Sequence, residues 1–91
     1  MRVLILDMVH GGDILARRHL AEGDDVTCVD VYGICPQSKK DELRAMEVRV
    51  ADTVPPGKYD MTVMPKHCPL TFIGDADPGE IVTFSRDVRR F

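Results

Sequence analysis

The chain has 91 residues, of which 44% are hydrophobic and 30% charged, and its formal net charge is -3. This length indicates one domain, and a domain of this size buries only roughly 60–65% of the surface that the unfolded chain exposes. The negative charge argues against a nucleic-acid partner held through phosphates, and no apolar stretch approaches the ~20 residues needed to span a membrane.

Strands and helices are predicted to alternate along the chain. The aliphatic run at residues 2–7 is typical of a strand buried on both faces, and helical spacing follows it. The expected strands cover residues 2–7, 25–30, 48–50, 59–64 and 80–84, and the expected helices cover residues 13–22 and 38–46. Ser38 is expected to cap the second helix, Pro65 to end the fourth strand, and Ser85 to cap a further helix over residues 86–91.

This order of elements predicts the fold class. Strands connected through helices imply right-handed crossovers and a parallel sheet. We expect an α/β protein, a Rossmann-like three-layer αβα sandwich with a five-stranded parallel sheet in the order 3-2-1-4-5. Residues 1–91 are expected to form a single substrate-binding domain, the N-terminal part of a larger protein. The order of the strands then reverses between the first and the fourth strand, and ligands bind at such a point.

Two loops are predicted to meet there. His10-Gly11-Gly12 follows the first strand and Lys66-His67-Cys68 follows the fourth. Backbone N–H groups at a helix start favour anions, and the glycines allow close approach. Candidate binding residues are His10, Gly11, Gly12, Asp30, Tyr32, Lys66, His67 and Cys68. Asp7 is expected to be structural, fixing the following turn through backbone N–H groups or holding His10 in one tautomer.

Two other kinds of site share some of these residues. Gly12, Ala16 and Asp30 match part of a dinucleotide-binding pattern, but Asp7 stands where that pattern has a glycine beside the pyrophosphate. A phosphate-receiver domain would need a carboxylate where Pro65 stands. The dinucleotide-binding module therefore stays open as an alternative, and the receiver domain is set aside.

The cysteines and histidines give a third alternative. His10, His67 and Cys68, with Cys35, lie on loops at one predicted sheet edge, although their spacing is not that of a zinc site. An odd number of scattered cysteines is typical of free thiols in a reducing compartment, so the protein is expected to be cytoplasmic. No metal ligands and no catalytic residues are predicted in this chain. His19 is expected to be solvated.

A family resemblance rests on three motifs: Asp7 with His10-Gly11-Gly12, then Asp30-Val31-Tyr32, and then Pro65 to Pro69, which contains His67-Cys68-Pro69. With these motifs the chain resembles the N-terminal domain of the Mur ligase family, in particular its archaeal coenzyme F-430 synthetase branch. The resemblance implies an ATP-dependent ligase that activates a propionate of a nickel tetrapyrrole. It also implies that the substrate crevice is lined by His10, Gly11, Gly12, Asp30, Tyr32, His67 and Cys68.

The resemblance also implies what other parts of such a ligase supply. The chain contains no GxxxxGK[ST] phosphate loop, so no cofactor is expected here, and ATP and magnesium belong to a downstream ATP-binding domain. The expected partners are a carboxylated small molecule, a tetrapyrrole, and that downstream domain, with no nucleic acid and no membrane. A non-catalytic regulatory domain remains a further alternative.

Overall fold

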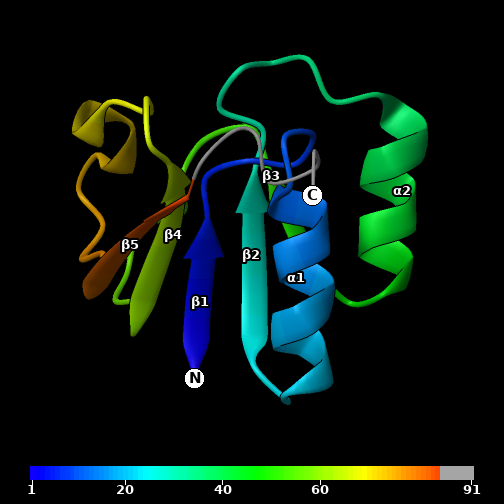
Figure 1. Cartoon of the computed structure of the whole chain (residues 1–91), viewed down its shortest axis with the longest axis horizontal. Helices are drawn as coiled ribbons and strands as arrows, with labels where there is room; N and C mark the ends of the chain where they lie inside the picture. Colours follow the sequence, from blue (N-terminus) through cyan, green and yellow to red (C-terminus); the bar gives the residue numbers. More distant parts are fainter. Residues whose placement is uncertain (85–91) are drawn as a thin grey trace.

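The computed structural model describes residues 1–84, which form a five-stranded sheet with two α-helices (Figure 1). The strands are β1 (Arg2–Ile5), β2 (Asp25–Val29), β3 (Arg49–Ala51), β4 (Met61–Pro65) and β5 (Glu80–Phe84). The helices are α1 (Gly12–Ala21) and α2 (Gln37–Ala45), and a 3-10 helix, η1, covers Leu70–Ile73. All pairs are parallel and the order is β3-β2-β1-β4-β5, which confirms the predicted fold class and strand order. The helix expected over residues 86–91 lies outside the described residues.

The two faces of the sheet are covered in different ways. Side chains alternate along β1, so Val3 and Ile5 face one side and Leu4 and Leu6 the other. The first pair packs in a core cluster with residues of α1 and α2, and we call this the helical face. The second pair packs with Tyr59, Met64, Cys68, Ile73 and Ala76 from β4 and the connections around it. This second side, the loop face, is thus covered mainly by irregular chain and η1, where the sandwich pattern has α-helices.

One local expectation was wrong and another is confirmed. Ser38 lies inside α2, whose N-cap is Pro36, with no side-chain cap hydrogen bond. Pro65 ends β4 as expected, because it is the last residue of that strand, and it pairs with Phe84. The Lys66 N–H still donates to the Phe84 carbonyl oxygen at 2.8 Å. Successive N–H groups point to opposite sides of a strand, and that of Lys66 points toward β5. The N–H group that Pro65 lacks would therefore point toward β1, beyond the last residue pair of β1 and β4.

The parallel pairing of β1 and β4 positions the candidate site. Ile5 pairs with Val63, so the chain leaves both strands at the same carboxyl edge. The loop after β1 and the loop after β4 therefore lie at one end of the sheet, as predicted, above the arrowheads in Figure 1. Among residues 1–84, no helix is long and apolar enough to cross a membrane.

Candidate functional site

Asp7 holds the turn between β1 and α1. Its side chain is fully buried, and one carboxylate oxygen accepts the backbone N–H groups of His10 at 2.9 Å and Gly12 at 2.7 Å. The other oxygen lies 3.2 Å from His10 Nδ1. The expected structural role of Asp7 is confirmed, since one carboxylate fixes both the turn and the histidine ring.

The two glycines shape this turn. Gly11 has φ of 117°, a left-handed conformation that side chains disfavour. Gly12 lies against Asp7, and a Cβ at Gly12 would stand 2.2 Å from the Asp7 carbonyl oxygen. Both glycines are buried, and the Gly12 N–H is already bonded to Asp7. A carboxylate of the chain itself therefore takes the place at the start of α1 where a dinucleotide pyrophosphate would lie.

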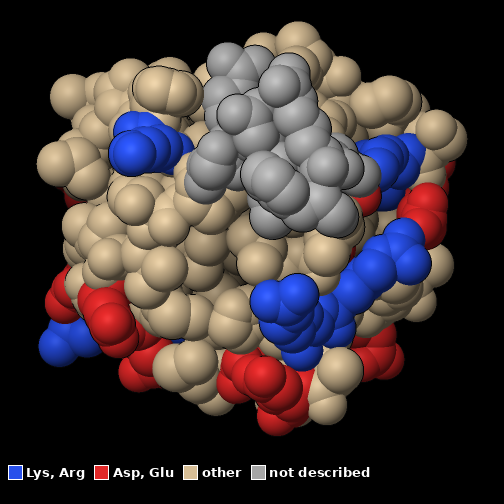
Figure 2. Space-filling view, viewed as in Figure 1, with Lys and Arg blue, Asp and Glu red and all other residues tan. Residues whose placement is uncertain are grey.

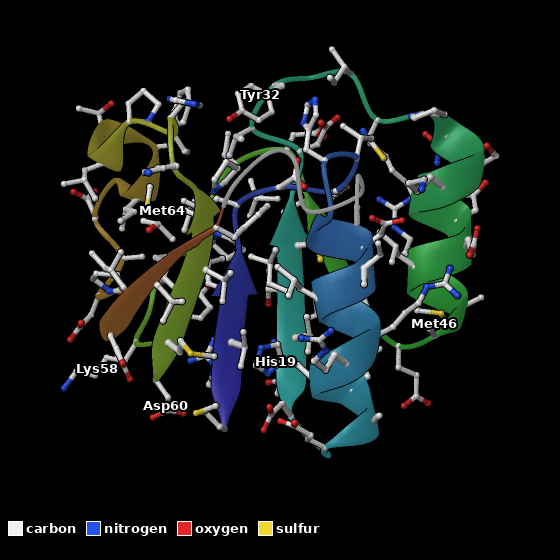
Figure 3. All side chains as sticks on the ribbon, viewed as in Figure 1. His19, Tyr32, Met46, Lys58, Asp60 and Met64 are labelled. Atoms are coloured by element: carbon white, nitrogen blue, oxygen red, sulfur yellow. The ribbon has the colours of Figure 1, made fainter. Side chains whose placement is uncertain are left out.

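His10 and Tyr32 form an aromatic pair across two loops. Their ring centroids are 5.5 Å apart and the planes are nearly perpendicular, at 89°. Edge-to-face contact of this kind is favourable beyond simple burial. Figure 3 shows Tyr32 above the carboxyl edge, at the opposite end of the sheet from Lys58 and Asp60. The structure thus brings together two of the predicted residues, one from the loop after β1 and one from the loop after β2.

Asp30 organises the loop that carries Tyr32. Its buried carboxylate accepts the N–H groups of Ile34 and Cys35, both at 3.2 Å, and lies 3.4 Å from the Lys40 ammonium group. Its carbonyl oxygen also accepts the Gly33 N–H at 3.1 Å. With these partners, Asp30 holds the backbone of the loop that follows β2.

Lys66, His67 and Cys68 follow β4 at the same edge. Lys66 and His67 are exposed, whereas Cys68 is buried in the core of the loop face. Burial raises the pKa of the Cys68 thiol above its ordinary value, so this cysteine is protonated at neutral pH. The loop therefore presents one ammonium group and one imidazole to solvent, and Cys68 anchors it.

Sequence reasoning missed the apolar character of this edge. Four exposed large side chains lie on the loops after β2 and β4, namely Tyr32, Ile34, Leu70 and Phe72. A cavity of about 220 Å³ has one of them, Phe72, in its wall, and it is lined by Val29, Val31, Asp52, Thr53, Val54 and Phe72. Val31 carried a signal in the sequence, as the middle residue of a candidate motif. Val54 and Phe72 carried none, because only the folded chain brings their segments to the end of β2.

The structure does not gather the loop histidines and cysteines into a metal site. Among the described residues, one group of three possible ligands has its donor atoms within 4.8 Å of one another, and it consists of His19, Glu22 and Asp24 at the far end of α1. His19 is only 14% exposed and its Nδ1 lies 3.0 Å from an Asp24 carboxylate oxygen, so the expectation that it is solvated was wrong. This contact ties the end of α1 to the start of β2.

The fold is that of a Rossmann-like α/β domain, with exposed apolar and basic side chains at the carboxyl edge of its sheet. The chain is 35% identical over 68 residues to Coenzyme F(430) synthetase of Methanosarcina acetivorans, a match that covers 72% of this chain. The chain spans about 14% of the length of that relative. No protein-family model matches the chain, and no solved structure does. The similarity supports a distant relationship.

Proposed function

We propose that this chain is the substrate-binding domain of an ATP-dependent ligase of the Mur type, and that it binds a carboxylated tetrapyrrole of coenzyme F-430 biosynthesis. The observation that carries the proposal is the convergence of exposed apolar and basic side chains at one edge of the sheet. A tetrapyrrole combines a broad apolar ring system with anionic propionates, so a matching site needs both kinds of side chain. The similarity to a protein named Coenzyme F(430) synthetase supports this choice of ligand.

The proposal gives each part of the edge a role. Tyr32, Ile34 and Phe72 supply apolar surface to the macrocycle. Lys66 and His67 are exposed beside it and face the propionates. The buried residues Asp7, Gly11, Gly12, Asp30 and Cys68 hold the loops that present these groups.

In this proposal, another domain supplies the ATP that drives the ligase reaction. The chain has no GxxxxGK[ST] loop to hold the phosphates of ATP. ATP and magnesium are assigned to a downstream domain, which closes on the substrate held here. The described residues then position the tetrapyrrole carboxylate, and no catalytic group is assigned to them.

Fluorescence titration with coproporphyrin, a tetrapyrrole bearing propionates, tests the proposal on the chain itself. We expect saturable binding that Tyr32→Ala and Lys66→Gln each weaken about threefold to tenfold, since a partly exposed contact is worth about 1 kcal/mol. Lys58→Gln is the matched control, because it removes the same charge at the opposite end of the sheet (Figure 3). Equal binding by Lys66→Gln, Lys58→Gln and the wild type would contradict the proposed site.

A further inference from the structure

Three side chains with metal-binding atoms meet at the far end of α1, away from the candidate site. His19 lies in the last turn of the helix, Glu22 is its C-cap residue, and Asp24 directly precedes β2. One donor atom from each of them lies within 4.8 Å of the other two. Figure 3 shows His19 toward the lower end of the sheet and Tyr32 beyond its upper end, so this cluster is separate from the carboxyl edge.

The separations between these donor atoms are close to those around a single metal ion. His19 Nδ1 lies 3.0 Å from an Asp24 carboxylate oxygen and 3.9 Å from a Glu22 carboxylate oxygen. Zinc binds imidazole nitrogen and carboxylate oxygen at about 2.0–2.2 Å in a tetrahedral arrangement, which sets its donor atoms roughly 3.4 Å apart. One ion can therefore bridge the three atoms after small side-chain movements, mainly of Glu22, whose side chain is 63% exposed.

The turn after α1 holds the cluster in place. The His19 carbonyl oxygen accepts the backbone N–H groups of Glu22 and Asp24, both at 3.1 Å. Gly23, which lies between them, has φ of 84° and so allows this tight helix end. The side chains of His19 and Asp24 are only 14% and 10% exposed. Two of the three donors are therefore nearly fixed before an ion arrives, which lowers the entropy cost of binding it.

The donor set decides which kind of ion fits. The other Asp24 oxygen lies 3.4 Å from the Met1 amino group, so one positive charge faces the two carboxylates of Glu22 and Asp24. The cluster therefore keeps a negative charge that attracts a cation. An imidazole nitrogen among the donors suits a divalent transition-metal ion, whereas Mg²⁺ and Ca²⁺ prefer oxygen ligands alone.

We propose that His19 Nδ1, Glu22 and Asp24 form a binding site for a divalent transition-metal ion of the zinc type. An ionised carboxylate only accepts hydrogen bonds, so Nδ1 carries the hydrogen between His19 and Asp24. The ion replaces that hydrogen, and the neutral ring then carries its hydrogen on Nε2. Once bound, the ion ties the last turn of α1 to the start of β2. The inference does not rest on the proposed function, whose ligand binds at the other end of the sheet.

A titration with Zn²⁺ followed by NMR tests the site, because the chain has three histidines and each has its own ring signals. We expect saturable binding of one ion that shifts the ring signals of His19 and leaves those of His10 and His67 in place. Loss of a residue that only supports a metal ligand costs about 10–100-fold in affinity, so Glu22→Gln should weaken binding at least tenfold. Glu47→Gln, the matched control, removes an exposed carboxylate outside the cluster and should bind Zn²⁺ like the wild type.

Magnesium separates a metal site from a patch of negative charge. A patch of carboxylates attracts Mg²⁺ as well as Zn²⁺, whereas a site built on His19 should bind Zn²⁺ at least tenfold more tightly than Mg²⁺. Equal binding of the two ions would overturn the inference. Zinc shifts centred on His67 or on Cys35, or zinc binding that Glu22→Gln leaves unchanged, would overturn it as well. Glu22 is at the surface, so this variant should fold like the wild type.

Discussion

Replacing Gly12 with alanine tests whether the turn after β1 is built by close contact with Asp7. Gly12 is the first residue of α1, and alanine inside a helix is favoured over glycine by about 1 kcal/mol. If the position had room, Gly12→Ala would therefore stabilise the protein. The added Cβ would instead stand 2.2 Å from the Asp7 carbonyl oxygen and 2.9 Å from a carboxylate oxygen of the same residue.

The expected loss follows from the two contacts that must give way. Forcing an extra carbon into a packed site costs about 1–3 kcal/mol. Weakening the buried bond from the Gly12 N–H to the Asp7 carboxylate costs about 1.5–3 kcal/mol. After the gain in helix propensity, we expect a net destabilisation of about 2–4 kcal/mol, within the roughly 5–15 kcal/mol that holds a domain together.

Urea unfolding followed by circular dichroism measures this change directly. Gly23→Ala is the control, because Gly23 has φ of 84° and no atom within 4 Å of an added Cβ, so it reports backbone strain alone, about 1–2 kcal/mol. A Gly12→Ala variant as stable as the wild type, or more stable, would refute the claim that close contact between Gly12 and Asp7 builds this turn.

Three further predictions concern single side chains. Asp7→Ala should destabilise the protein by about 2–3 kcal/mol in urea unfolding, because it leaves the N–H groups of His10 and Gly12 without the acceptor that the buried carboxylate provides. A hydrogen bond from His19 holds the pKa of Asp24 below its ordinary value, so Asp24 stabilises the fold above that value and loses this contribution as the pH falls through the folded pKa. The gap in urea midpoint between the wild type and Asp24→Asn should therefore be fully open at pH 6 and narrow below about pH 4, and a gap independent of pH would contradict this assignment. Burial raises the thiol pKa of Cys28 most, so a disulfide reagent at pH 8 should label Cys35 in the folded protein and reach Cys28 only on unfolding.

The sheet could be predicted from the sequence because each strand has a strong local signal. The aliphatic run of β1, the alternation in β2 and the glycine after α1 each indicate one element, and the crossover rule then leaves few strand orders. Element ends were less predictable. Pro65 is a strong local signal to stop, and β4 does end there. Ser38 looked like a helix cap, but α2 begins one residue earlier with Pro36 as its N-cap, and the local sequence does not decide between these two starts.

The site was only partly predictable for a similar reason. Parallel topology places the loops of His10 and Lys66 at one edge, and this follows from strand order alone. A polar side chain can contact a ligand or its own chain. Which of the two occurs depends on where the backbone N–H groups lie after folding, and a sequence pattern does not show this. Asp30 looked like a ligand-binding acid, yet it accepts N–H groups from its own loop. The cavity depends on residues that meet only after folding, such as Val54 and Phe72.

The central claim is that a tetrapyrrole binds at the carboxyl edge, and ring-current shifts in the NMR spectrum of the chain with coproporphyrin test it most directly. A porphyrin ring shifts nuclei that it stacks against, so the signals of Tyr32, Ile34 and Phe72 should move in proportion to occupancy. Those of Lys58 and Asp60, at the other end of the sheet in Figure 3, should stay in place. Shifts centred on Lys58 and Asp60, or no saturable shifts at all, would contradict the account.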